Sequence, residues 1–200
     1  MKIKINDEFV IELFGRKKVF KLKGVPFFEF EFLPKRPCIS FIILAAKDFS
    51  SKKIKDIISV IESLKQKYIL DIVIVVSNEK DLDELQRVFP KSFYKVNISD
   101  ALENPVFSSV KCGIRAVSPY SIGAVLIFAN RPSLTPDVLE KLIYAIQKGN
   151  LISIPKKDNK RTHPIAFSSL LFNVIKNLRK EKGIPYILRK YRENISYVEI

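Results

Sequence analysis

The spacing of hydrophobic residues changes near residue 38. Before this point, apolar and charged residues alternate over residues 8–13, 20–23 and 28–32, the pattern of strands with one face in water. Beyond it, short continuous apolar runs alternate with segments in which apolar residues recur every three or four positions. We therefore predict a small antiparallel meander over residues 1–33, a boundary at Pro34–Pro37, and an α/β domain over residues 38–200.

The apolar runs of the second part have the length of buried strands. They predict strands at residues 39–46, 71–77, 93–98, 124–129, 151–155, 164–167 and 195–198. Periodic segments predict helices that begin near residues 50, 82, 105, 136, 168 and 186. Alternation of strands with crossover helices favours a three-layer, Rossmann-like α/β sandwich with one mixed, mostly parallel sheet. Residues 1–33 would form a short antiparallel appendage to it.

The stretch from Gly123 to Gly149 combines a buried strand, a polar loop and a helix in immediate succession. Thr135 is a suitable helix cap, and the proline after it suits the first helical position. The loop between strand and helix contains Asn130 and Arg131. Because ligands of open α/β sheets bind at the carboxyl ends of the strands, these two residues are candidates for ligand contact.

A second candidate loop follows the first buried strand. It contains Lys47, Ser51, Lys52 and Lys53 around a predicted helix start. Three lysines at a helix N-terminus oppose the helix dipole, so a bound anion would relieve their repulsion. The loop has no glycine, which close backbone approach to a pyrophosphate usually needs. Phosphate binding by side chains and an ordinary solvated turn both remain open for this segment.

Composition limits the class of protein. The chain has 200 residues, 47% of them hydrophobic and 28% charged, enough to build a core without disulfides. Cys38 and Cys112 are therefore expected to be reduced, buried thiols. No apolar run approaches the roughly 18 residues of a membrane span, and the first residues lack the pattern of a signal peptide. We expect a cytoplasmic protein without a membrane partner.

Positive charge is concentrated in one segment. The formal net charge is +14, and residues 156–192 hold eleven basic residues against two acidic ones. This segment favours a phosphorylated or polyanionic ligand, with a solvated basic surface as the alternative. The sequence has no zinc-finger, RNP-like or GXXG signature, so nucleic acid has no support as a partner. The only histidine, His163, is a candidate for ligand contact or for a structural role.

Five segments in a fixed order resemble the molybdenum cofactor nucleotidyltransferases, the guanylyl- and cytidylyltransferases of the nucleotide-diphospho-sugar transferase superfamily. They are ILAA at 43–46, SSVKCGI at 108–114, LIFANRPSLTPDVLEKLI at 126–143, ISIPKKDNKRTHPIAF at 152–167 and EKGIPYILRKY at 181–191. The resemblance covers residues 38–200. The Gly-x-x-Lys and Gly-x-Pro signatures of that family occur upstream, at Gly15–Lys18 and Gly24–Pro26.

The resemblance implies a nucleotide site and an acceptor site. The nucleotide site would comprise Ala45, Ala46, Lys47, Ser51, Lys52, Lys53 and Lys18. The second substrate, molybdopterin or another phosphorylated small molecule, would contact Ser109, Arg131 and His163. Asn130 stands where the family has the aspartate of an Asp-Gln-Pro-Leu loop that binds the metal, so this position is degenerate. We therefore expect weak Mg²⁺ binding or none.

Three functions remain open at this point. The first is transfer of GMP or CMP from a nucleoside triphosphate such as GTP to molybdopterin, in molybdenum cofactor biosynthesis. The second is a catalytically lapsed relative that binds a nucleotide or a partner, favoured by the missing aspartate and loop glycines. The third is a glycosyltransferase of related fold, for which the chain lacks an Asp-x-Asp motif. The sequence leaves undecided whether the chain is an enzyme.

Overall fold

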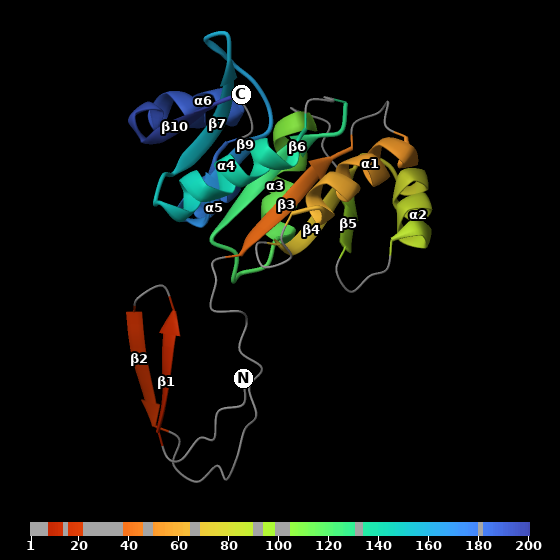
Figure 1. Ribbon diagram of the computed structural model, residues 1–200. Coiled ribbons are helices and arrows are strands. Elements are labelled where there is room, and N and C mark those ends of the chain that lie inside the picture. The colour runs from red at the N-terminus through yellow and green to blue at the C-terminus, as the bar shows by residue number, and fades with distance from the viewer. Residues whose placement is uncertain are drawn as a thin grey trace. The chain divides into compact units, whose positions relative to one another are not determined.

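A computed structural model of the chain describes residues 8–13, 16–21, 38–45, 50–64, 69–89, 94–98, 105–130, 134–179 and 182–200. For residues 8–13, 16–21 and 94–98 it describes the backbone alone. The chain forms two compact units, Met1–Lys35 and Arg36–Ile200, drawn in Figure 1. In the first unit, β1 (Glu8–Leu13) pairs antiparallel with β2 (Arg16–Lys21). The strand predicted at 28–32 and the predicted boundary prolines lie outside the described residues.

The second unit is built on one eight-stranded mixed sheet. Its strands are β3 (Ile39–Leu44), β4 (Ile69–Val76), β5 (Tyr94–Ile98), β6 (Gly123–Phe128), β7 (Ile152–Lys157), β8 (Lys160–Arg161), β9 (Ile165–Ser168) and β10 (Ile195–Glu199). The order is β10-β7-β9-β6-β3-β4-β5, and β8 pairs with β7. Neighbouring strands are parallel except at β9, which is antiparallel to both β6 and β7, and at the β7–β8 pair.

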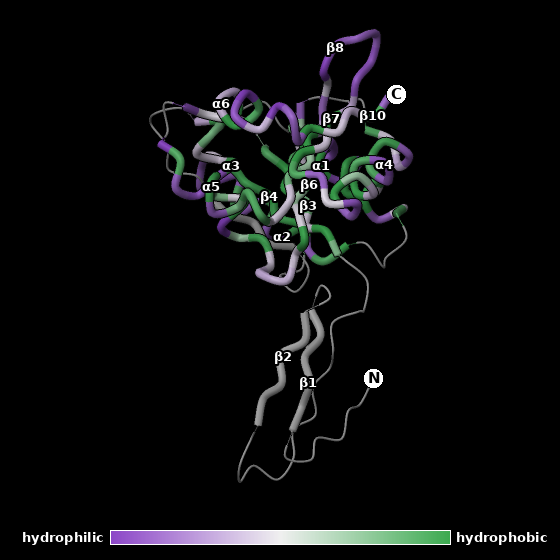
Figure 2. The backbone as a smooth tube through the Cα atoms, turned by 90° about the vertical axis from the view of Figure 1, so that its left-hand side faces the viewer, coloured by the Kyte–Doolittle hydropathy of each residue, from purple (hydrophilic) through white to green (hydrophobic). Residues whose placement is uncertain are grey.

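Helices cover both faces of this sheet. They are α1 (Ser51–Glu62), α2 (Glu79–Val88), α3 (Pro105–Ala116), α4 (Pro136–Gln147), α5 (Phe172–Asn177) and α6 (Gly183–Lys190). Buried residues of α1, α2 and α4 form one core cluster with one face of the strands, and those of α3, α5 and α6 form another with the opposite face. The predicted three-layer α/β sandwich is therefore confirmed, and Figure 2 shows its apolar centre in green.

The central strands are buried on both faces, as their uninterrupted apolar sequence predicts. All six residues of β3 are buried, and Phe41 and Ile42 project to opposite faces into the two clusters. Burying one such side chain contributes about 1.5–3 kcal/mol. Ser40 is the polar exception in β3, and its backbone amide donates to the hydroxyl of Ser121 at 3.0 Å.

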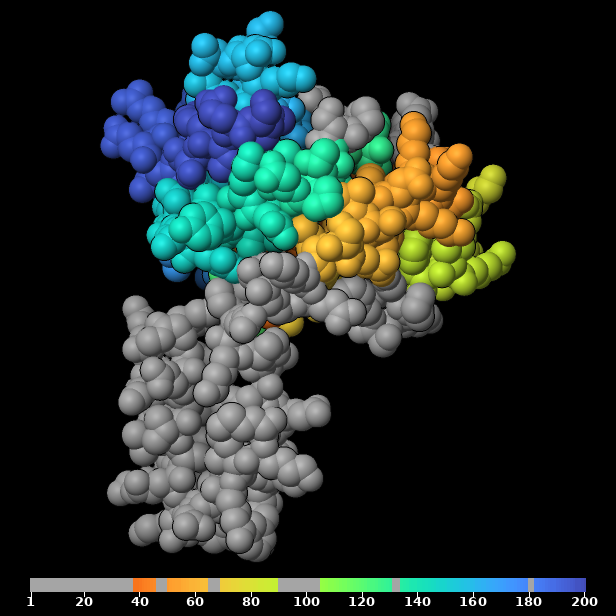
Figure 3. Space-filling model, viewed as in Figure 1, coloured from red at the N-terminus to blue at the C-terminus, as the bar shows by residue number. Residues whose placement is uncertain are grey.

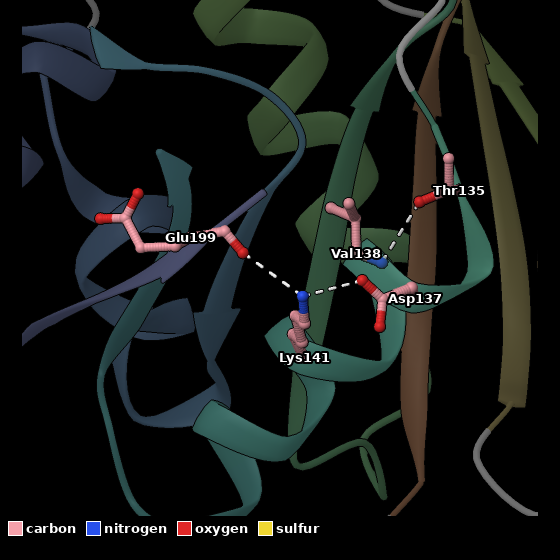
Figure 4. Close-up of polar contacts among 5 residues, drawn as sticks. All are labelled: Thr135, Asp137, Val138, Lys141 and Glu199. Atoms are coloured by element: carbon pink, nitrogen blue, oxygen red, sulfur yellow. Dashed lines mark hydrogen bonds and ion pairs between the residues drawn. The ribbon is translucent and has the colours of Figure 1, made fainter. Parts of the chain in front are cut away.

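The start of α4 has the predicted capping. The Thr135 hydroxyl accepts from the Val138 amide at 3.4 Å, and Pro136 occupies the first turn. One turn later, the ammonium of Lys141 lies 2.8 Å from the Asp137 carboxylate and donates to the backbone carbonyl of Glu199 at 3.3 Å (Figure 4). The first turns of α4 are thereby joined to strand β10, which follows much later in the chain.

Several predicted elements have different limits in the structure. Helix α2 begins at Glu79 rather than near residue 82, because the Asn78 side chain caps it by accepting from the Asp81 amide. The helix predicted from residue 168 is a 3-10 turn, Ser169–Leu171, followed by α5. Strand β8 was not predicted. A second 3-10 turn, Arg192–Asn194, leads into β10.

Both cysteines belong to the described residues and neither forms a disulfide. Cys38 is buried, and burial raises the pKa of its thiol, so the neutral form is favoured there. Cys112 is half-buried in α3. Among the described helices, none combines the length and hydrophobicity needed to cross a membrane.

Candidate functional site

The candidate site lies at the edge where β3, β4, β6 and β7 end. Main-chain hydrogen bonds continue past the last strand residues at this edge. The Ala45 amide donates to the Val75 carbonyl at 2.8 Å, and the Ala129 amide donates to the Leu44 carbonyl at 3.0 Å. The loops that leave β3 and β6 therefore start side by side, about one strand spacing of 4.8 Å apart.

The first of these loops leads into α1. Ser50 is the helix cap: its hydroxyl accepts from the Lys53 amide at 3.3 Å. Ser51, the first helical residue, is half-buried, while Lys52 and Lys53 are exposed. No acidic residue occupies the first turn of α1. Positive side chains thus add to the positive end of the helix dipole, which makes this end of α1 suited to an anion.

The structure describes only some of the other residues predicted for the nucleotide site. Ala45 is buried at the end of β3. Ala46 and Lys47 lie outside the described residues. Lys18 lies in β2, in the first compact unit, and only its backbone is described. The structure therefore brings Ala45, Ser51, Lys52 and Lys53 to one end of the sheet.

Asn130 is exposed in the turn after β6. Arg131 lies outside the described residues. Within the described part of the chain, no three His, Cys, Asp or Glu side chains are grouped closely enough to hold a metal ion. An amide oxygen can coordinate Mg²⁺ but adds no charge to compete with water for it. Asn130 is thus the described residue at the position where the resemblance places a metal ligand, and weak Mg²⁺ binding stays a prediction.

His163 lies beside the end of β6. It directly precedes Pro164 and strand β9, and the peptide bond between His163 and Pro164 is cis. The imidazole contacts the ring of Phe128 edge to face, with ring centroids 4.7 Å apart. Phe128 ends β6 and is two residues from Asn130. Since β9 is antiparallel, the residues that enter it lie at the same edge as the residues that leave β6.

Ser109, also predicted to contact the second substrate, uses its hydroxyl within α3. The hydroxyl donates to the Pro105 carbonyl at 2.9 Å, one turn back along the helix. This i to i−4 bond adds to the helical hydrogen bonding of α3 and directs the side chain along the helix. A ligand that contacts the Ser109 oxygen would meet a group already engaged as a donor, with only acceptor capacity left.

A basic hairpin at the same edge was not singled out from the sequence as a structural unit. Strands β7 and β8 are joined by Asp158 and Asn159, and Figures 1 and 2 show this hairpin projecting beyond the end of the sheet. The signal was present in the sequence, because an Asp-Asn pair between two short basic runs is typical of a tight hairpin turn. The absence of apolar residues in the two basic runs hid β8 and the last two residues of β7.

Comparison with protein families identifies one match. Residues 57–195 match the family described as the MobA-like NTP transferase domain. The matched segment contains Asn130, His163, both strands of the basic hairpin and most of the sheet, but it begins after the start of α1. No curated protein is significantly similar in sequence to the chain.

Solved structures share the fold at low sequence identity. The Rv0371c protein from Mycobacterium tuberculosis H37Rv has a TM-score of 0.65 and 16% identity, over 82% of this chain and 88% of that one. A 4-diphosphocytidyl-2C-methyl-D-erythritol synthase from Anaerococcus prevotii DSM 20548 has a TM-score of 0.60 and 15% identity, over 82% and 87%. A CMP:2-keto-3-deoxy-manno-octonic acid synthetase complexed with CTP has 0.60 and 8%, over 82% and 90%.

Proposed function

The chain belongs to the family of MobA-like NTP transferase domains, and on this premise we propose that it binds a nucleoside triphosphate at the ends of β3 and β6. In the proposed reaction, an oxygen of a phosphorylated acceptor attacks the α-phosphorus, the bond to the β-phosphate breaks, and pyrophosphate leaves. The nucleotide is GTP or CTP and the acceptor is molybdopterin or a similar phosphorylated molecule. A solved structure of this fold, the octonic acid synthetase, is complexed with CTP.

The observation that carries the proposal is the positively charged start of α1. The exposed Lys52 and Lys53 side chains belong to the first turn of α1, which contains no acidic residue. In phosphoryl transfer most of the catalytic effect comes from positioning and from neutralising charge on the phosphate oxygens. Ammonium groups at a helix N-terminus supply both without any covalent chemistry.

Metal binding is a separate question from nucleotide binding. One solved structure of Rv0371c is a complex with manganese. At the ends of β3 and β6, the described residues of this chain offer the amide of Asn130 and no cluster of carboxylates. We therefore assign no step to a metal. Asn130 and His163 would act by hydrogen bonding to the nucleotide or the acceptor.

The same observation favours a second candidate, a relative that binds nucleotides without transferring them. Loss of a charged metal ligand lowers the rate of transfer far more than it lowers binding, because the metal acts chiefly on charge that develops in the transition state. In this alternative, the start of α1 still holds the triphosphate. The protein would then respond to nucleotide as a sensor or a binding partner.

A thermal-shift panel separates these functions. The melting temperature is measured with GTP, CTP, ATP and UDP-sugars, each with and without Mg²⁺. A ligand at a hundred times its dissociation constant stabilises the folded state by about 2.7 kcal/mol, which is readily measured. We expect GTP or CTP to raise the melting temperature. A response to UDP-sugars alone would point to a glycosyltransferase, and no response to any nucleotide would contradict the proposal.

Replacement of Lys52 and Lys53 by alanine tests the assignment to α1. We expect the double variant to bind the preferred triphosphate about tenfold more weakly, because two charge-assisted contacts to phosphate are lost. Both side chains are exposed, so the melting temperature without ligand should change little. Isothermal titration calorimetry gives the dissociation constant directly. Lys55→Ala with Lys148→Ala, two other exposed lysines, is the matched control.

Equal affinity in the Lys52→Ala, Lys53→Ala variant and the parent would contradict a role for the α1 lysines. An equal loss in the control variant would instead indicate an effect of net charge. The nucleoside 5′-monophosphate provides a further comparison. If the lysines hold the outer phosphates, they should affect its affinity much less than that of the triphosphate.

A further inference from the structure

The hairpin of β7 and β8 places four cations in a small, rigid unit. Lys156 is paired with Arg161 and Lys157 with Lys160 across the two strands. The turn residues Asp158 and Asn159 have φ angles of 49° and 62°, as a tight two-residue hairpin turn requires. Because cross-strand neighbours point to the same face, one pair of cations lies on each face of the hairpin.

Like charges directly opposite one another destabilise a strand pair. Among the described residues, no carboxylate forms an ion pair with any of the four cations. Asp158, at the tip, is exposed. Glu199 is the register partner of Lys156 on β10, whereas Lys157 and Lys160 are paired only with each other. The charge of this second pair is therefore not balanced by a described ion pair, and a bound anion would remove the repulsion.

The two cation pairs differ in how they are held. The Lys156 ammonium lies 5.8 Å from the centroid of the Tyr197 ring, and the guanidinium of Arg161 lies 5.4 Å from it. These contacts fix the first pair against strand β10. Lys157 and Lys160 are exposed, so their side chains can reach a ligand from solvent. In the space-filling view, the hairpin forms the light-blue projection at the top (Figure 3).

The hairpin leads directly into the candidate site. Arg161 is followed in the chain by Thr162 and then His163. The Thr162 amide donates to the Pro155 carbonyl at 2.9 Å, which holds this segment against β7. Three residues of extended chain span at most about 10 Å, so the backbone of Lys160 is within that distance of His163. His163 in turn contacts Phe128 at the end of β6. The hairpin is thus next to the proposed reaction centre but separate from the start of α1.

We propose that the β7–β8 hairpin binds a phosphate monoester group of the second substrate, with Lys157 and Lys160 as its direct contacts. The proposal rests on the function proposed above, and it predicts an acceptor that carries a phosphate distinct from those of the nucleotide. A single phosphate matches this contact, because Lys157 and Lys160 are cross-strand neighbours on one face of the hairpin. A longer polyanion would need further basic residues in a row leading away from the site. The cations of the hairpin instead lie close in sequence to His163.

The test uses inorganic phosphate as the probe on the full chain labelled with nitrogen-15. Sodium phosphate replaces sodium chloride step by step, so that the ionic strength stays constant. The chemical shifts of the backbone amides are followed by NMR. We expect saturable shifts at residues 157–161. In the Lys157→Gln, Lys160→Gln variant, the affinity should fall about tenfold. The control, Arg115→Gln with Lys148→Gln, removes the same charge from exposed positions at the ends of other helices.

The variant should fold, because removing the charges of both opposed lysines relieves their repulsion and touches no core residue. Its melting temperature should equal or exceed that of the parent. Equal phosphate affinity in the variant and the parent, or shifts that never saturate, would overturn the proposal. A response of these amides to a fifteen-residue oligothymidylate, uncompeted by phosphate, would also overturn it and indicate a polyanion surface.

Nucleotide binding distinguishes the two proposals. The Lys157→Gln, Lys160→Gln variant should keep its thermal stabilisation by GTP or CTP. If the nucleotide stabilises the protein but phosphate does not bind the hairpin, this inference fails and the proposed function stands. If phosphate binds the hairpin but no nucleotide stabilises the protein, the proposed function fails.

Discussion

Replacement of Asn130 by aspartate is expected to make nucleotide binding dependent on Mg²⁺. In the parent protein, we expect Mg²⁺ to change the affinity for GTP or CTP little, because the turn after β6 offers an uncharged oxygen. Aspartate has nearly the same size and returns one anionic ligand to the end of the strand. Saturating Mg²⁺ should then tighten binding by about 1.5–3 kcal/mol, or roughly ten- to hundredfold in Kd.

Calorimetry with and without Mg²⁺ measures this effect. Asn173→Asp is the matched control, since it adds the same charge at an exposed position in α5 and should leave the Mg²⁺ response as in the parent. Strong Mg²⁺-dependent transfer of a nucleotide by the parent protein would contradict the prediction. Another carboxylate would then have to hold the metal.

The second large effect concerns the centre of the sheet. Phe41→Ala should lower the free energy of unfolding by about 3–5 kcal/mol, because it removes a fully buried ring from β3, an interior strand of the sheet. This is a large share of the roughly 5–15 kcal/mol that stabilises a typical domain. Phe41 faces the cluster formed with α1, α2 and α4. The loss should be measured by urea unfolding.

Leu170→Ala provides the comparison for Phe41→Ala. Leu170 is 74% exposed, so its truncation should change the free energy of unfolding by no more than about 0.5 kcal/mol. Similar losses for the two variants would show that the centre of β3 is not packed as described. A change in the slope of the unfolding transition would show that the denatured state had changed as well.

The strands and helices could be predicted where burial decides the sequence. In β3, β4 and β6 both faces are covered, so the strands are continuously apolar and stand out in the sequence. In α4 the cap, the proline and the apolar stripe agree with one another. Prediction failed where burial was slight. The first turn of α2 is polar, and β8 consists of two exposed basic residues.

Other features could not be read from the sequence because they depend on pairing. A run of four apolar residues looks the same in a parallel and an antiparallel strand, so the direction of β9 was not predictable. That direction brings His163 beside Phe128, and it also brings the basic hairpin to this edge. The sequence did indicate Ser51, Lys52 and Asn130, since loops after buried strands fall at the carboxyl ends of a sheet. How these residues bind a ligand stays a prediction.

The place of β9 has a consequence for the order of assembly. Strand β7 has β9 and β10 as its neighbours in the sheet, and both follow it in the chain. During synthesis, β3, β4 and β6 can pair with one another while β7 still has only the two residues of β8 beside it. Strand β9, residues 165–168, lies between β6 and β7, so β6 can be joined to β7 and β10 only after β9 has been made. The contact between His163 and Phe128 therefore forms only when β9, in the last quarter of the chain, joins the sheet.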